Sequence, residues 1–334
     1  NPTYVYATNG LYTVTLYAKT TCHNNFIRKD HLIYVGGGRL ETLWIGGNGL
    51  SANNCGNLFD VKIKNPRGLK ITSFDVSLRS VRSSNAAMEV WICSGTYLGN
   101  DNLPDRWVLA ATGTGVSSGG LAGDRTYIDT SDFFLPPGDY GMYIIQNTGG
   151  IHYTDGTGTN QTYSDAHMEL TLGVGKNLKF SGSVFNPRVW NGAIYFDKDD
   201  AASNGPFGRG CIGSNTAIPT MSLSSEPVLG QATTIEVTGM TRTSGMGWMF
   251  IGLTDLTGMD LTNMGMTDCR LHANPIALTF AIANNSGNAS VPATIPRSPS
   301  LAGSFIALQV ACVDTGANPL GVAATAGHAV RLGY

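Results

Sequence analysis

Residues Tyr4–Val35, YVYATNGLYTVTLYAKTTCHNNFIRKDHLIYV, decide which fold this chain is expected to have. Aromatic and apolar side chains stand at every second position, and a turn at Asn9-Gly10 separates the first pair from the others. Alternation with a period of two predicts half-buried β-strands, and a last strand is expected at His31–Val35. The alternating residues are Tyr4, Tyr6, Tyr12, Val14, Leu16 and Ala18.

These strands are too few to bury two inner sheet faces. A complete Ig-like sandwich has about seven strands in roughly 100 residues, and this segment is far shorter. We therefore expect the missing strands to come from elsewhere: from a part of the module outside this chain, or from another part of the structure such as a neighbouring molecule. An exposed sheet edge is a template for such pairing. The predicted assembly residues are Tyr4, Tyr6, Tyr12, Val14 and Leu16.

The composition favours a turn-rich β protein of two to three domains. The chain has 334 residues, of which 42% are hydrophobic and 43 are glycine, and this is enough to build several cores. Charged residues make up 13%, against roughly 25% in an ordinary soluble protein. A net charge of −2 without a concentrated basic face argues against a nucleic-acid partner. The longest apolar runs, 140–145 and 248–253, are too short for a membrane span of about 20 residues.

Period-two patterns continue through the rest of the chain. In the middle part, Met88, Val90 and Ile92 alternate, and a phase slip at Ser73 predicts a β-bulge. A Pro-Pro-Gly turn at 136–138 leads into a near-continuous apolar run, which is typical of a strand covered on both faces. In the last third we expect strands near 233–237, 248–253, 278–283, 305–313 and 329–333.

Glycine-rich and polar stretches divide the chain. Gly36-Gly37-Gly38 and the segment DKDDAASNGPFGRG at 197–210 are predicted boundaries. The expected fold is all-β, with tandem β-sandwiches. The expected parts are a partial PKD or Ig-like module at 1–35, a jelly-roll-like sandwich at 36–196, a linker at 197–210 and a C-terminal sandwich at 211–334.

The opening stretch resembles the C-terminal part of a PKD domain, an Ig-like module of secreted bacterial proteins. The matching residues are Tyr4-x-Tyr6, Gly10-x-Tyr12-x-Val14-x-Leu16-x-Ala18 and Ile33-Tyr34-Val35. The middle and last parts resemble uncharacterised domains of the same class of proteins, and the middle match includes LPPGDYG at 135–141 and NPRVWNG at 186–192. The resemblance implies secretion to the cell surface or medium and a modular organisation, but no activity.

Six widely spaced cysteines predict disulfides in an oxidising compartment. No CxxC pair occurs, which disfavours zinc. The preferred pairs are Cys55–Cys93 and Cys211–Cys269, because each lies within one expected domain. The pairing of Cys22 and Cys312 stays open, as does the alternative of buried free thiols.

No catalytic set converges in the sequence. Gly115-Val116-Ser117-Ser118-Gly119 fits the GxSxG pattern, but the glycines that follow cannot start the helix that a nucleophile elbow needs. The six histidines show no metal-binding spacing. Asp101, Asp105 and Trp107 form only a loose acidic and aromatic cluster, which we interpret as an exposed loop rather than a glycosidase site.

Three kinds of binding or modification site remain as weaker candidates. Asp197, Asp199, Asp200 and Asn204 offer oxygen ligands for calcium, although a solvated linker is the preferred interpretation. Trp91, Trp107 and Trp190 are either a sugar-stacking platform or, as we prefer, core residues. Sequons place candidate glycans at Asn160, Asn284 and Asn288, in stretches expected at the surface.

Two function classes follow. The preferred one is a non-enzymatic extracellular structural protein, a subunit of a surface filament or fibre assembled through β-strand or module complementation between protomers. The alternative is an adhesin or a carbohydrate-binding region of a larger secreted protein. We expect further copies of the chain as partners, glycans as additional candidates, and no cofactor other than the calcium alternative.

Overall fold

The computed structural model describes residue 4 and residues 10–19, 24–35, 37–197, 201–241 and 245–334. These residues form an all-β fold, which confirms the predicted class. Helical structure within them is limited to three 3₁₀ helices, η1 (Pro104–Arg106), η2 (Thr262–Met264) and η3 (Pro299–Leu301). In this part of the chain no helix is long and apolar enough to cross a membrane.

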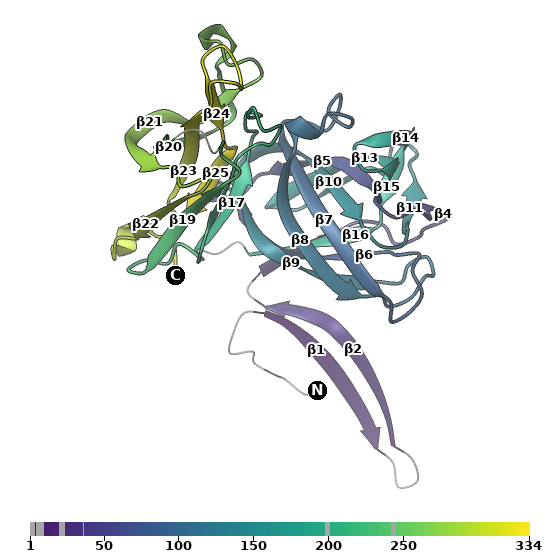
Figure 1. The fold of residues 1–334 in the computed structure, drawn as a ribbon. Coiled ribbons are helices and arrows are strands. Elements are labelled where there is room, and N and C mark those ends of the chain that lie inside the picture. The colour runs from purple at the N-terminus through teal and green to yellow at the C-terminus, as the bar shows by residue number, and fades with distance from the viewer. Residues whose placement is uncertain (1–3, 5–9, 20–23, 36, 198–200, 242–244) are drawn as a thin grey trace.

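The N-terminal stretch forms a hairpin that stands away from the rest of the molecule (Figure 1). Strand β1 (Gly10–Lys19) pairs antiparallel with β2 (Asn24–Val35), and the two form a sheet of their own. The second strand begins at Asn24 rather than at His31 as expected. Tyr4 lies outside any strand, and Tyr6 lies outside the described residues.

The middle part is one large antiparallel sheet with a small sheet beside it. Its core contains side chains from both sheets, including Phe59 and Trp190, whose rings stack at 5.3 Å. A jelly roll has eight strands in two sheets, whereas here eleven strands join one sheet. The large sheet contains β3 (Gly37–Glu41), β5 (Cys55–Ile63), β6 (Leu69–Val76), β7 (Asn85–Ser94), β8 (Val108–Val116), β9 (Thr126–Leu135), β10 (Gly138–Gln146), β12 (Thr162–Ser164), β13 (Met168–Leu178), β14 (Ser181–Phe185) and β16 (Gly192–Asp197). The small sheet contains β4 (Asn48–Leu50), β11 (Ile151–Asp155) and β15 (Arg188–Trp190).

Local patterns placed several of these strands correctly. Met88, Val90 and Ile92 all point into the core from β7. The pairing of β6 with β9 shifts register between Ile71 and Ser73, which confirms the bulge expected from the phase slip. Strand β10 is buried from Tyr140 onward, as a strand covered on both faces must be.

The C-terminal part packs a six-stranded sheet against a three-stranded one. Their facing side chains form a second core, to which Val237 contributes from one sheet and Met249 and Val310 from the other. The larger sheet contains β17 (Ser203–Phe207), β20 (Met246–Asp260), β21 (Arg270–Ala283), β23 (Phe305–Val313), β24 (Val322–Ala324) and β25 (Gly327–Arg331). The smaller sheet contains β18 (Thr220–Leu223), β19 (Ala232–Thr238) and β22 (Ala289–Thr294).

The predicted linker at 197–210 is wrong for residues 203–207. These residues form β17, which pairs with β25 at the edge of the C-terminal sheet and also lies against β9 of the middle sheet (Figure 1). Gly205 permits this approach, because a Cβ at this position would lie 2.6 Å from the backbone nitrogen of Phe134. Gly205 therefore permits close packing here rather than marking a flexible boundary.

The two parts share one core across this contact. Phe207, Ala307 and Ala329 are fully buried together with side chains of the middle sheet. The ring of Phe134 lies 5.8 Å from that of Phe305. The buried guanidinium of Arg331 lies 4.8 Å from the Phe134 ring, and its Nε donates to Ala201 and Ser203.

The close approach at Gly205 leads to a stability prediction. Gly205→Val should lower the free energy of unfolding by about 1–3 kcal/mol or more, because the added side chain overlaps the backbone of β9. The control is Gly245→Ala, since a Cβ at Gly245 would have no atom within 4 Å. Urea denaturation measures both. Equal stabilities of the two variants would contradict the close contact.

Candidate functional site

The hairpin exposes apolar side chains on both of its faces. Leu16 lies opposite Ile27, and Tyr17 lies opposite Phe26 at the next position of the register. Successive side chains of a strand point to opposite faces, so the two pairs lie on different faces of the hairpin. The four side chains are 60–76% exposed. An isolated two-stranded hairpin is marginally stable in water, and this one covers neither apolar pair with another described strand.

The predicted assembly residues have different positions. Leu16 is exposed on β1, whereas Tyr12 and Val14 on the same strand are partly buried. Tyr4 is 78% exposed. Tyr6 cannot be placed, because it lies outside the described residues.

The disulfide Cys211–Cys269 is confirmed. It joins the segment after β17 to the loop that precedes β21, and the two Cα atoms are 5.1 Å apart. The bond closes a loop across 58 positions of sequence and therefore restricts the unfolded chain.

The predicted pair Cys55–Cys93 is wrong, and both residues are buried free thiols. Strand β10 lies between them: Cys55 is opposite Gln146 on one side of β10, and Cys93 is opposite Gly141 on the other. Their side chains also belong to different core clusters. Burial raises the pKa of Cys55 to about 11 and that of Cys93 to about 12. Cys312 is a third buried thiol, and Cys22 lies outside the described residues.

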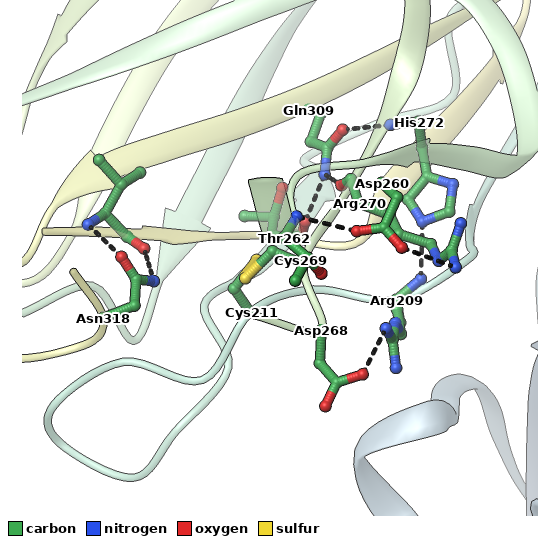
Figure 2. The surroundings of a disulfide bond; sticks show 12 residues. Arg209, Cys211, Asp260, Thr262, Asp268, Cys269, Arg270, His272, Gln309 and Asn318 are labelled. Atoms are coloured by element: carbon green, nitrogen blue, oxygen red, sulfur yellow. Dashed lines mark hydrogen bonds and ion pairs between the residues drawn. A yellow bond between two sulfur atoms is a disulfide. The ribbon is translucent and has the colours of Figure 1, made fainter. Parts of the chain in front are cut away.

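An ion-paired junction surrounds the disulfide (Figure 2). The Asp268 carboxylate, next to Cys269, accepts hydrogen bonds from Arg106 at 2.9 Å and from Arg209 at 3.2 Å. Arg106 lies in η1 of the middle part, so Asp268 links the two parts of the molecule. This cluster has no signal in the sequence, because its members are far apart in the chain and follow no spacing.

His272 is held neutral behind this cluster. Its Nε2 accepts the backbone N–H of Arg209 at 3.1 Å, and its Nδ1 therefore carries the proton that is donated to the carbonyl of Asp255 at 2.8 Å. Burial lowers the pKa of this imidazole. Gln309 accepts the backbone N–H of His272 and donates to Arg270, which fixes the strands around the site (Figure 2). The arrangement is that of a structural histidine.

A second polar network crosses the contact between the parts. His328 donates from Nε2 to Asn204 at 2.7 Å, and Asn204 donates to Glu226 at 3.2 Å. Glu226 in turn lies 3.7 Å from Lys70 of the middle sheet. The amide oxygen of Asn204 is thus engaged by a histidine, which argues against its predicted role in a calcium site.

Of the other calcium candidates, the structure describes only Asp197. Asp199 and Asp200 lie outside the described residues, and Asp197 is the last residue of β16. In the described part of the chain, no three His, Cys, Asp or Glu side chains are grouped as metal ligands would be.

The three tryptophans do not form one platform. Trp190 is buried in the middle core. Trp107 is 3% exposed, and its indole N–H donates to Asn100 at 2.8 Å. Trp91 is partly buried, with the Lys179 ammonium 4.3 Å from its ring. Trp91 and Trp107 nevertheless line a mainly apolar groove of about 550 Å³ between the two parts, together with Pro206, Ile218 and Met221.

The catalytic motifs have structural roles. Ser117 is 2% exposed, its hydroxyl lies 3.2 Å from the carbonyl of Ser80, and no helix follows it before β9. Asp101 is not a free acid in a loop, because it pairs with the fully buried ammonium of Lys176 at 2.8 Å. Both candidates thus have structural contacts within the middle part.

The sequons differ in accessibility. Asn284 is 6% exposed, and its amide donates to Thr241 and accepts from Gly287, so the expectation of a surface position is wrong there. The Asn160 amide is partly buried and donates to the carbonyl of Asp155. Asn288 is exposed. Glycosylation at Asn288 therefore stays a prediction that the geometry permits.

Burial of His328 predicts a pH-dependent stability. Its pKa is lowered to about 4, against about 6.5 in an unfolded chain. The unfolded state therefore binds the extra proton, so this stability is complete above pH 6.5 and is lost as the pH falls towards 4. The loss should reach about 3 kcal/mol.

Comparison with His328→Gln isolates this effect, because glutamine keeps an N–H donor and does not titrate. Burial raises the pKa of Glu226, which acts in the opposite direction, but Glu226 is present in both proteins. Urea denaturation at several pH values should show the advantage of the native protein shrinking below pH 6.5. A constant difference would exclude a buried neutral imidazole.

Removing the disulfide should destabilise the C-terminal part. The double variant Cys211→Ser, Cys269→Ser should unfold with a free energy lower by about 2–4 kcal/mol, because its unfolded chain regains conformational freedom. A reductant should lower the melting temperature of the native protein but not that of the variant. If reductant affects both proteins equally, the bond is not the stabilising element.

Comparisons with protein-family models and with curated sequences do not assign this chain to a family. No protein-family model and no curated protein sequence matches the chain. The exposed hairpin, the ion-paired junction and the apolar groove are therefore the features from which a function can be argued.

Proposed function

We propose that this chain is a non-enzymatic extracellular structural protein, a subunit of a filament or fibre assembled by β-strand complementation between copies. The observation that carries the proposal is the hairpin β1–β2, which exposes apolar side chains on both faces. Figure 1 shows this hairpin standing away from the rest of the molecule. Covering Leu16, Tyr17, Phe26 and Ile27 in a partner would contribute about 4–8 kcal/mol. This is enough to drive association of an element that is marginal alone.

A second copy offers a suitable acceptor at β21. Outside the hairpin, β21 is the longest of the described strands that end a sheet, with 14 residues, and the next longest, β22, has 6. Natural proteins usually protect such an edge with charged side chains. Pro275 and register shifts against β20 interrupt the first half of β21. Residues 276–283 contain no Asp, Glu, Lys, Arg or Pro, and Ile276 and Leu278 are 42% and 54% exposed.

The outer edge of β1 matches this acceptor in its lack of charge. Residues 10–18 are also uncharged, so pairing the two edges would place no charge opposite another until Lys19 is reached. The donor and acceptor surfaces differ, and a contact of this kind is heterologous. Unless its rotation closes a ring, it continues as a filament.

The disulfide supports an extracellular location for this assembly. Disulfides persist in oxidising compartments and are rare in the cytosol. Cys211–Cys269 therefore fits a secreted or cell-surface protein. The low content of charged side chains, 13%, also suits a subunit whose surface is largely covered by neighbours.

A binding region is the second candidate, and the groove lined by Trp91 and Trp107 favours it. Ligand sites are concave, mostly apolar and about 300–1,000 Å³ in volume. This groove has about 550 Å³. A sugar or peptide contacting Trp91 would support an adhesin or carbohydrate-binding role.

Electron microscopy and sedimentation of three variants test the assembly. Leu16→Lys in the hairpin and Leu278→Lys at the acceptor edge should each abolish filaments, because a lysine cannot be buried in an apolar strand contact without a partner charge. Leu121→Lys is the control, since Leu121 is 74% exposed in a loop outside both surfaces. It should leave filaments unchanged.

The outcomes separate the two levels of this proposal. A native protein that remains monomeric at all concentrations would overturn assembly and favour the binding region. Filaments that are lost with Leu16→Lys but persist with Leu278→Lys would retain the hairpin as donor and exclude β21 as acceptor. Loss of filaments in the Leu121→Lys control would make the effect nonspecific.

A further inference from the structure

The junction beside the disulfide contains a cavity of about 480 Å³ between the two parts of the molecule. Three arginines line it: Arg106 from η1, Arg209 from the segment after β17, and Arg270 from β21. Asn100 and His272 are also in its wall. No step of the proposed assembly uses this cavity.

Arg209 is the unusual member of this wall. Its side chain is 8% exposed, and one of its nitrogens, Nη2, donates to Asp268. Its Nε and Nη1 are fully buried and have no hydrogen-bond partner among the described residues. Buried guanidinium N–H groups without acceptors are costly and rarely occur in native proteins. Arg209 therefore needs an acceptor that the described part of the chain does not provide.

Arg106 has the same deficit. Its Nη2 donates to the same Asp268 oxygen, so one carboxylate is shared by two guanidinium groups. Its buried Nε has no hydrogen-bond partner among the described residues, and the Asp105 carboxylate lies 3.9 Å away, beyond hydrogen-bonding distance.

The remaining charges near the cavity are largely compensated. Arg270 is engaged by Asp260 at 3.4 Å and by the carbonyl of Gly258 at 3.0 Å. Asp139, the acidic residue in the cavity wall, is 63% exposed and lies 3.5 Å from Lys62. The uncompensated donors are therefore those of Arg106 and Arg209.

We infer that this cavity binds a small organic acid, with its carboxylate between Arg106 and Arg209. Carboxylate oxygens are the acceptors that guanidinium groups bind most strongly, with charge-assisted hydrogen bonds. The volume exceeds what the anionic group alone needs, so the rest of the ligand would lie beside Asn100 and Leu256. Because the site lies between the parts, its occupant would also fix their contact. The inference is independent of the proposed assembly.

The intact chain tests this site by isothermal titration calorimetry at constant ionic strength. Galacturonate and citrate are the carboxylate probes, inorganic sulfate is the second anion, and chloride is the reference. Binding of a carboxylate probe is expected. Binding of sulfate but of neither carboxylate probe would contradict the organic acid and indicate an inorganic anion as the ligand. If no probe gives heat above the chloride reference, the cavity is not an anion site, and water is the acceptor for the arginine N–H groups.

Two variants with opposite expected effects distinguish binding from structure. Arg106→Gln should weaken carboxylate binding about tenfold, because it removes a charged donor. Asp268→Asn should strengthen binding several-fold, because it removes the carboxylate that competes for both arginines. Both variants break the same ion pair, so a purely structural role would change stability in both and affinity in neither.

Arg82→Gln is the matched control, because Arg82 is exposed and is not in the cavity wall. It should bind the probe like the native protein. Equal affinities for native protein, Arg106→Gln and Asp268→Asn would contradict the inference. Thermal melts of each variant confirm that it is folded before titration.

Discussion

The contact of β17 with β9 is the constraint on which the rest of the molecule depends. A five-residue strand belongs to the sheet of the C-terminal part and packs on the sheet of the middle part. It can do so only because Gly205 has no side chain where the backbone of Phe134 passes. Around this point the two parts share a core, and Arg331 and His328 become buried.

The polar junction follows from that packing. Bringing the parts together places η1 opposite the disulfide loop, and Asp268 then accepts hydrogen bonds from Arg106 of η1 and from Arg209. Figure 2 shows the second of these contacts. Each buried histidine is neutral for the same reason, because the contact removes it from water. The hairpin is the opposite case: it forms a sheet of its own, and no other described strand pairs with it. The middle and C-terminal parts thus bury their polar contacts in a shared junction, whereas the N-terminal hairpin leaves its apolar side chains exposed.

Much of the fold was predictable from local patterns. Period-two alternation placed β7, and a near-continuous apolar run placed β10. The phase slip at Ser73 marked a real bulge, because such patterns depend only on neighbours along the strand. The cysteine at 211 was paired correctly. Cys55 and Cys93 were not, since sequence proximity does not show that β10 separates their strands. Strand β17 was mistaken for a linker, because a stretch rich in glycine and proline has the same composition in a flexible turn as in a closely packed strand. The arginine junction leaves no trace in sequence spacing at all.

The shared core has a consequence for how this chain could be inherited and rearranged. Modules of secreted proteins are exchanged most easily when each buries its own apolar surface and joins its neighbours through exposed linkers. Here a cut before β17 would expose Phe133 and Phe134 of the middle sheet and Phe207 and Ala329 of the C-terminal one. We therefore expect the middle and C-terminal parts to be inherited together as one unit. The hairpin pairs with no strand of either part, so its replacement would leave both cores intact.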